Sequence, residues 1–513
     1  MSEKLFKSTA IVSMMTFLSR ILGFVRDIVI ARLFGAGVGA DVFFVAFKIP
    51  NFLRRLFAEG AFSQAFIPVL AEYRQRGDKD LKELIANTSG TLAGMLFVIT
   101  AIGVIAAPIL VMIFAPGFID NHQKLNLAGD LLTITFPYLF FISLTALAGS
   151  ILNSFGKFAV PAFTPVFLNL SLIACAIWLS PLLEQPVMAL AWGVFIGGVV
   201  QLVFQIPFLM NIGQLPKPKW GWHNSGVQKI LKLMLPAMFG VSVSQINLLL
   251  DTLLASFLVT GSISWLYYSD RLVEFPLGIV GIALATVILP SLSRKHAAAS
   301  KAEFSQTIDW AFRWVFIIGT PAAIGLIYLA EPLLLTLFQY GEFRPEDAHK
   351  ASLSLMAYGL GLLPFIFIKV LAPGYFARQD TKTPVKIGII AMVTNMVLNI
   401  ILMLQFAHVG LALATSLSAG LNAALLFVGL RQLGVYQPDV GWRKFFFKLV
   451  VANVSLLLVL LWLTPPSTAW LSWDVWQRFS HLLGLISAAA VIYFAVLALV
   501  GFKLTSLLKL KAE

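Results

Sequence analysis

The feature that most constrains this chain is a series of long apolar segments that recurs from one end to the other. Each runs for about 20 residues or more, the length that a helix needs to cross the roughly 30 Å hydrocarbon core of a bilayer. The absence of ten-residue alternation favours helices over a barrel. With 59% hydrophobic and 12% charged residues, the chain has too little polar surface for a soluble globule of 513 residues. We expect an all-α polytopic membrane protein with fourteen transmembrane helices, near residues 8–34, 41–72, 88–115, 127–153, 160–181, 186–211, 229–259, 264–292, 306–330, 348–375, 383–405, 408–431, 444–464 and 480–502.

The Lys and Arg residues between these segments lie mostly on one side of the membrane. Loops on the side of the N-terminus carry 24 of them, and the opposite loops carry four, namely Lys124, Arg344, Lys350 and Arg478. The positive-inside rule therefore predicts cytoplasmic N- and C-termini. The formal charge of +13 is mostly this orientation signal and requires no nucleic-acid partner. Because Arg20 and Arg26 interrupt the first segment and no small-residue cleavage site follows, we expect a retained helix rather than a signal peptide.

An internal repeat divides the chain. Four residue pairs recur at a spacing of 222 to 224 positions: Asp27 and Asp251, Gly37 and Gly261, Pro68 and Pro290, Pro161 and Pro384. This spacing predicts two six-helix lobes, residues 1–215 and 216–435, and leaves residues 436–513 as an additional helix pair. Because six helices return the chain to the same side, the repeat is parallel, an arrangement that places a substrate cavity between the lobes.

The stretch "SRILGFVRD", residues 19–27, places three charges inside the first predicted helix. On a helical wheel Arg20 and Asp27 fall within about 60° of each other, whereas Arg26 lies about 120° from Arg20. A tie between Arg20 and Asp27, or snorkelling at the helix end, would be a structural explanation. Arg20 lies too deep to snorkel easily, and charges at such depth normally face a cavity or a partner. We therefore expect Arg20 to contact a ligand.

The second predicted helix contains "FKIPNFLRRLFAEGAF", in which Pro50 should produce a kink. Arg55 and Glu59 are spaced to pair within the helix, so Arg55 is expected to be structural. Arg54 points about 100° away from Arg55 around the helix and is expected to contact a ligand. Lys48, one turn earlier, is expected to line the same wall of the ligand site as Arg54.

In the eighth predicted helix, "YYSDRLVEFP" holds Arg271 and Glu274, spaced either for an intrahelical pair or for a gate or ligand contact. The positive charges inside the membrane concentrate in the first lobe. Converging arginines suit phosphate oxygens, so the cavity is expected to attract an anion and to suit a di- or pyrophosphate better than a carboxylate.

Asp251 is a carboxylate deep in the seventh predicted helix, with no Lys or Arg within a turn. Such a group must be protonated, matched by a cation from another helix or bound to a metal ion. A tie to Arg271 or Lys369 and a role in Na⁺ or H⁺ coupling both remain open. We expect no other metal site and no cofactor, because Cys175 is the only cysteine and the six histidines show no ligand spacing.

Several long motifs resemble the MurJ (MviN) family of lipid II flippases, within the multidrug/oligosaccharidyl-lipid/polysaccharide exporter superfamily. They include "SRILGFVRD", "GAGVGADVFFVAFKIPNFLRRLFAEGAFSQAFIPVLAEY", "YYSDRLVEFPLGIVGIALATVILPSLS" and "KVLAPGYFARQDTKTPVKI". The resemblance implies export of the lipid-linked peptidoglycan precursor across the bacterial cytoplasmic (inner) membrane by alternating access, with a role in cell-wall biogenesis and cell shape. It also implies that the last two helices form a groove for the polyprenyl tail. The family's cavity arginines fall on Arg20, Arg26, Arg54 and Arg271, and its acidic gate or cavity positions on Asp27, Asp41, Glu59 and Glu274.

Two alternatives remain at this point. A related exporter could move another polyprenyl-pyrophosphate oligosaccharide or a drug, although exporters of cationic drugs would not be expected to need a cationic lobe. The other alternative is a membrane transferase that uses polyprenyl phosphate. Against it, no acidic metal motif, in-membrane histidine pair or activated nucleophile is evident in the sequence. The chain also lacks a G-x-x-x-x-G-K-[ST] loop, so direct use of ATP is not expected. The energy source stays open between a Na⁺ or H⁺ coupling ion and the membrane potential.

Overall fold

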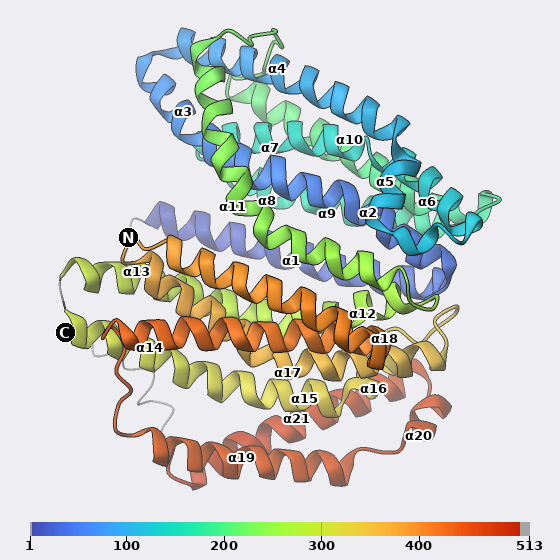
Figure 1. Cartoon of the computed structure of the whole chain (residues 1–513), viewed down its shortest axis with the longest axis vertical. Helices are drawn as coiled ribbons and strands as arrows, with labels where there is room; N and C mark the ends of the chain where they lie inside the picture. Colours follow the sequence, from blue (N-terminus) through green and yellow to red (C-terminus); the bar gives the residue numbers. More distant parts are fainter. Residues whose placement is uncertain (1–2, 299, 503–513) are drawn as a thin grey trace. The chain divides into compact units, whose positions relative to one another are not determined.

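The computed structural model describes the backbone of residues 3–298 and 300–502. Side chains are described within these ranges for all residues except 3–10, 57–60, 237, 239–244, 248, 282, 283, 285 and 286. Every regular element in the described part is a helix, which confirms the predicted all-α class (Figure 1). Nine of the described helices or helix runs are long and apolar enough to cross a membrane. The chain divides into two compact units, Met1–Ser264 and Trp265–Glu513, which we describe separately.

Unit 1 is built around long helices that pack along one another. Its α-helices are α1 Glu3–Phe34, α2 Val38–Arg54, α3 Ser63–Arg76, α4 Asp78–Ile105, α5 Ala107–Phe114, α6 His122–Thr135, α7 Tyr138–Ser154, α8 Ala159–Phe163, α9 Pro165–Ala174, α10 Met188–Asn211 and α11 Ser225–Ala255. Short π- and 3₁₀-helices occupy η1 Arg55–Phe62, η2 Pro116–Phe118, η3 Cys175–Leu179 and η4 Ser180–Leu182. Helix α1 packs on α9, and α11 packs on η1 and α3.

The ends of these helices follow local chemistry. Gly35 adopts a positive φ of 62° directly after α1, a conformation that glycine adopts without strain. Helix α11 begins where the side chain of Asn224 accepts hydrogen bonds from the amides of Gly226 and Val227. These features mark the end of α1, which carries Arg20 and Arg26, and the start of α11, which carries Asp251.

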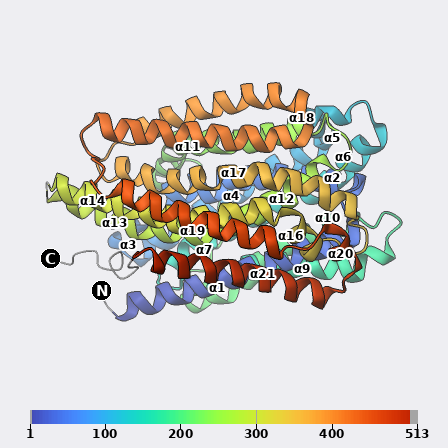
Figure 2. The same ribbon diagram turned by 90° about the horizontal axis from the view of Figure 1, so that it is seen from below.

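Unit 2 has a second helical set. It contains α12 Ser262–Pro276, whose first three residues belong to unit 1, followed by η5 Leu277–Gly281, α13 Ile282–Ala297, α14 Lys301–Trp314, η6 Val315–Gly319, α15 Thr320–Tyr328, α16 Ala330–Leu337, α17 Pro345–Phe376, α18 Lys382–Gln432, α19 Trp442–Leu463, α20 Ser467–Ser472 and α21 Val475–Leu499. Helices α19 and α21 lie side by side in both views and contact α15 and α16 (Figures 1 and 2).

The 51-residue α18 consists of two helical arms. Ala407 has non-helical angles (φ 50°, ψ −129°), and the amide of Asn395 lies 3.4 Å from the hydroxyl of Thr415 across this break. The arms therefore fold back on each other, as the two orange helices of Figure 2 show. Helix α18 thus contains two of the predicted segments, 383–405 and 408–431.

Candidate functional site

The charges of α1 form a buried cluster with α9. Arg26 and Asp27 are 8% and 1% exposed. The guanidinium of Arg26 donates to Asp27 Oδ1 through Nε at 2.9 Å and Nη2 at 2.6 Å, and through Nη1 to Asn169 Oδ1 at 3.1 Å. Asn169 in turn donates to the carbonyl of Ser19 at 3.1 Å. This network fixes the orientation of the Arg26 guanidinium inside an apolar helix pair.

Arg20 lies two helical turns earlier, and its side chain is exposed. The helical wheel grouped Arg20 with Asp27, and the contact to that carboxylate described above comes from Arg26. Adjacent residues on a helix point about 100° apart, but a long guanidinium can bend back to reach its neighbour. Asn169 carries no charge and lies 143 positions away, so nothing in the sequence marked it as a partner of Arg26.

Asp41 forms the second cluster, at the start of α2. It is 2% exposed and accepts hydrogen bonds from the amide of Gly261 at 2.6 Å and from the amide and hydroxyl of Ser264 at 2.9 and 2.6 Å. Gly261 has a φ of 99°, and α12 begins at the next residue. The carboxylate therefore caps the start of α12 from another helix, which is where a helix terminus favours negative charge.

The third group lies where α2 passes into η1. Lys48 and Arg54 are half-buried, and Arg54 Nε donates to Asn51 Oδ1 at 2.9 Å. Arg55 is exposed and lies 3.4 Å from Gln245 Oε1 of α11. Residues 55–62 form a π-helix rather than the predicted α-helix, and the pairing of Arg55 with Glu59 stays a prediction. The side chain of Glu59 lies outside the described residues.

Unit 2 holds the remaining predicted pair on α12. Arg271 Nη1 donates to Glu274 Oε2 at 2.7 Å, so the i,i+3 contact is present. The guanidinium also lies 4.8 Å from the centre of the Tyr267 ring. The side chains of Arg271 and Glu274 are 33% and 50% exposed, which leaves this pair accessible to a ligand.

Asp251 lies near the end of α11 and is half-buried. Among the described residues, no three His, Cys, Asp or Glu side chains are grouped closely enough to share a metal ion. The single cysteine, Cys175, is buried. The role of Asp251 in coupling stays a prediction.

Three of the predicted arginines are oriented by hydrogen bonds to neighbouring side chains. Arg26 and Arg271 each keep a carboxylate partner that holds the guanidinium in position, and Arg54 is held by an amide oxygen. Guanidinium groups present planar, paired donors that match phosphate oxygens. Binding of an anion by Arg26, Arg54 and Arg271 therefore stays a prediction.

Comparison with known proteins gives a consistent result. The family described as "Lipid II flippase MurJ" matches residues 30–481. A protein of Vibrio cholerae serotype O1, described as "Probable lipid II flippase MurJ", is 56% identical over 514 residues, covering 99% of this chain and 98% of the relative. The "Lipid II flippase MurJ" of Burkholderia cenocepacia is 42% identical and covers 97% of this chain and 98% of its own.

Solved structures agree. One titled "Lipid II flippase MurJ, inward closed conformation" has a TM-score of 0.78 at 27% identity and covers 95% of this chain and 99% of that chain. An inward-facing multidrug resistance MATE transporter of the MOP superfamily has a TM-score of 0.63 at 13% identity, covering 82% of this chain and 97% of its own. The latter likeness concerns the fold alone.

Proposed function

Because this chain belongs to the lipid II flippase MurJ family, we propose that it moves lipid II, the undecaprenyl-pyrophosphate-linked disaccharide pentapeptide, from the inner to the outer leaflet of the bacterial cytoplasmic membrane. The family match over nearly the whole chain carries this proposal. The buried, oriented guanidinium of Arg26 supports it, since a pyrophosphate is the charged part of the molecule to be moved. The protein is a transporter, and the proposal involves no catalytic step.

The finer architecture belongs to the same proposal. We infer fourteen transmembrane helices, two six-helix lobes and both termini in the cytoplasm. Alternating access would expose the cavity first to one leaflet and then to the other. Arg20, Arg26, Arg54, Arg271 and Lys48 would bind the pyrophosphate, and Asp27, Asp41, Glu59 and Glu274 would act as gate or cavity acids. The last helix pair would hold the polyprenyl tail.

A transport assay tests the proposal. Proteoliposomes are loaded with labelled lipid II in one leaflet, and its appearance in the other leaflet is followed with an enzyme that cannot cross the membrane. We expect transport only in vesicles that contain the protein. Vesicles with a different polyprenyl-pyrophosphate oligosaccharide form the comparison, and preference for that lipid would contradict the assignment of lipid II.

The energy source is a separate part of the proposal. The energy coupling is assigned to the helix α11: we propose that Asp251, a half-buried carboxylate near the end of this helix, couples transport to Na⁺, H⁺ or the membrane potential. Asp251→Asn should then still bind lipid II but lose the dependence of transport on the ion gradient. Unchanged ion dependence in proteoliposomes would assign Asp251 a structural role.

A further inference from the structure

Unit 2 contains a cavity of about 430 Å³ at the start of α19. Its walls are mainly aromatic and come from α14, η6, α17, α18, α19 and the loop before α19. The rings that matter here are Phe316, Phe367, Phe427, Tyr436, Trp442 and Phe446. No residue predicted to bind the pyrophosphate lines this cavity, so it is distinct from the proposed pyrophosphate site.

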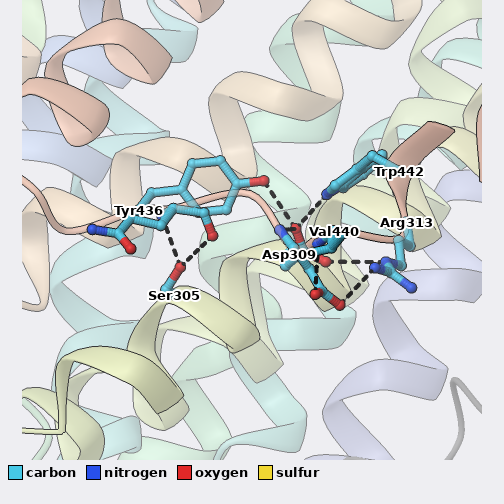
Figure 3. Close-up of polar contacts among 8 residues, drawn as sticks. Ser305, Asp309, Arg313, Tyr436, Val440 and Trp442 are labelled. Carbon is cyan, nitrogen blue, oxygen red and sulfur yellow. Dashed lines mark hydrogen bonds and ion pairs between the residues drawn. The ribbon is translucent and has the colours of Figure 1, made fainter.

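A buried carboxylate holds two of these rings in place. Asp309, 5% exposed, accepts hydrogen bonds at Oδ1 from Tyr436 Oη at 3.0 Å and Trp442 Nε1 at 2.5 Å (Figure 3). Arg313 Nε donates to Oδ2 of the same carboxylate at 3.0 Å. Burial and the nearby carboxylate raise the pKa of Tyr436 far above its usual range, so the phenol remains a donor. The polar atoms of both rings are thereby satisfied, and their contribution to the cavity wall is apolar.

The rim of the cavity is exposed. Phe446 is 40% exposed, and Ala424, which also lines the cavity, is exposed as well. Both residues lie on helices that are apolar enough to span a membrane. An alkyl chain from the surrounding bilayer could therefore reach the opening.

Basic side chains lie close to the lining residues in space or in sequence. The guanidinium of Arg431 lies 6.0 Å from the centre of the Phe427 ring, and that of Arg313 lies 5.4 Å from the Trp442 ring. Arg443 and Lys444 follow Trp442 and are exposed. The carboxylates of Asp309 and Asp439, both bound to Arg313, balance two of these four positive charges. A net positive charge remains, on the side that the Lys and Arg distribution predicts to be cytoplasmic.

We propose that this cavity binds one acyl chain of an anionic glycerophospholipid, with the lipid phosphate at Arg431 and the neighbouring cations. Basic pockets between membrane helices on the cytoplasmic side are typical binding sites for anionic head groups. A zwitterionic lipid offers no net charge to the basic rim. Because Trp442 and Phe446 belong to α19, an occupied cavity stabilises the attachment of the terminal helix pair. This inference goes beyond the proposed transport of lipid II and does not depend on it.

Lipid titration of the full-length protein tests the proposal. Purified, delipidated protein receives dioleoyl phosphatidylglycerol or dioleoyl phosphatidylcholine, and the thermal midpoint is recorded. Ala424→Trp fills the opening, and Arg431→Gln removes a charge at the rim. Matched controls are Ala490→Trp, at an exposed alanine of α21, and Lys386→Gln, at an exposed lysine of α18.

We expect the anionic lipid alone to raise the midpoint of the wild type saturably. Ala424→Trp should abolish this rise, and Arg431→Gln should weaken apparent affinity about tenfold, because a charge-assisted contact is lost. Both controls should behave as the wild type. Arg431→Gln keeps the test valid if Ala424→Trp does not fold.

Three results would overturn the proposal. Equal effects of the two lipids would indicate ordinary annular lipid. An unchanged response in Arg431→Gln would show that the rim does not bind the phosphate. A saturable response to undecaprenyl phosphate, with none to phosphatidylglycerol, would assign the cavity to a polyprenyl tail.

Discussion

At the scale of single residues, Arg26 combines burial with three hydrogen bonds to side chains of α1 and α9. Arg26→Lys should keep the charge but lose the planar fork that reaches Asp27 and Asn169 together. We expect lipid II transport to fall by about tenfold or more, since a charge-assisted hydrogen bond contributes about 1.5–3 kcal/mol. The measurement is the proteoliposome assay at matched protein levels. Arg20, Arg54 and Arg271 are predicted to respond in the same way.

The control for this series is Arg294→Lys, because Arg294 is exposed at the end of α13. It should transport normally. Full transport by the Lys variants at all four predicted positions would remove the pyrophosphate assignment.

Asp41 gives a second prediction at this scale. In Asp41→Ala, both carboxylate oxygens that accept from the amides of Gly261 and Ser264 are removed. We expect faster hydrogen exchange at these two amides, corresponding to a local loss of about 1–3 kcal/mol. Exchange at Gly226 and Val227, which Asn224 caps, should be unchanged. Unchanged exchange at Gly261 would mean that Asp41 does not hold this turn closed.

The sequence identified the charged members of these clusters but not their partners. Arg26 and Asp41 stand out because charge is rare in apolar helices. Asn169, Gly261 and Ser264 do not, because uncharged polar residues and turn glycines are common and their role depends on which helices pack together. Only tertiary structure brings these partners to the carboxylate or guanidinium.

At the scale of helices, apolar run length predicted the class of the elements well, because backbone hydrogen bonding in a bilayer leaves little choice. Local irregularities were harder to predict. The sequence supports a kink at Pro50, but the π-helix Arg55–Phe62 begins one turn later, where no proline lies. This π-helix packs on α11, which lies far along the chain, so its surroundings are not evident from the local sequence.

The start of α18 provides a prediction about pH. Asp380 Oδ1 accepts from the amide of Thr383 at 3.0 Å, and the hydrogen bonds from Thr383 lower the pKa of Asp380 below its ordinary value of 3.8. A carboxylate with a lowered folded-state pKa stabilises the fold above the unfolded-state pKa of 3.8 and loses this effect as the pH falls through the folded-state pKa. Asp380→Asn should therefore lower the thermal midpoint at neutral pH but not below that folded-state pKa. A midpoint difference that persists at that acidity would contradict the capping role.

At the scale of the whole molecule, sequence spacing and packing describe different properties. The repeat compares positions about 224 residues apart, whereas the compact units reflect which helices contact each other. Helix α11 packs on η1 and α3, within a unit that extends to Ser264. A repeat in the sequence does not determine which helices pack on each other. The lobe limits 1–215, 216–435 and 436–513 therefore stay predictions.

The terminal helix pair supplies the last prediction, which depends on how α19 and α21 are attached. Arg478, 6% exposed, donates to the carbonyl of Leu335 at 3.0 Å, and Tyr493 donates to the carbonyl of Ile317 at 2.7 Å. A chain truncated before residue 440 should still insert into the membrane, because the apolar segments before that point remain. We expect it to lose lipid II transport, since the proposed tail-binding helices are absent, and to have a lower thermal midpoint. Arg478→Gln separates the two effects: it should lower the midpoint while retaining transport below that temperature, because the helix pair itself is intact. Normal transport by the truncated chain would show that the polyprenyl tail does not need α19 and α21.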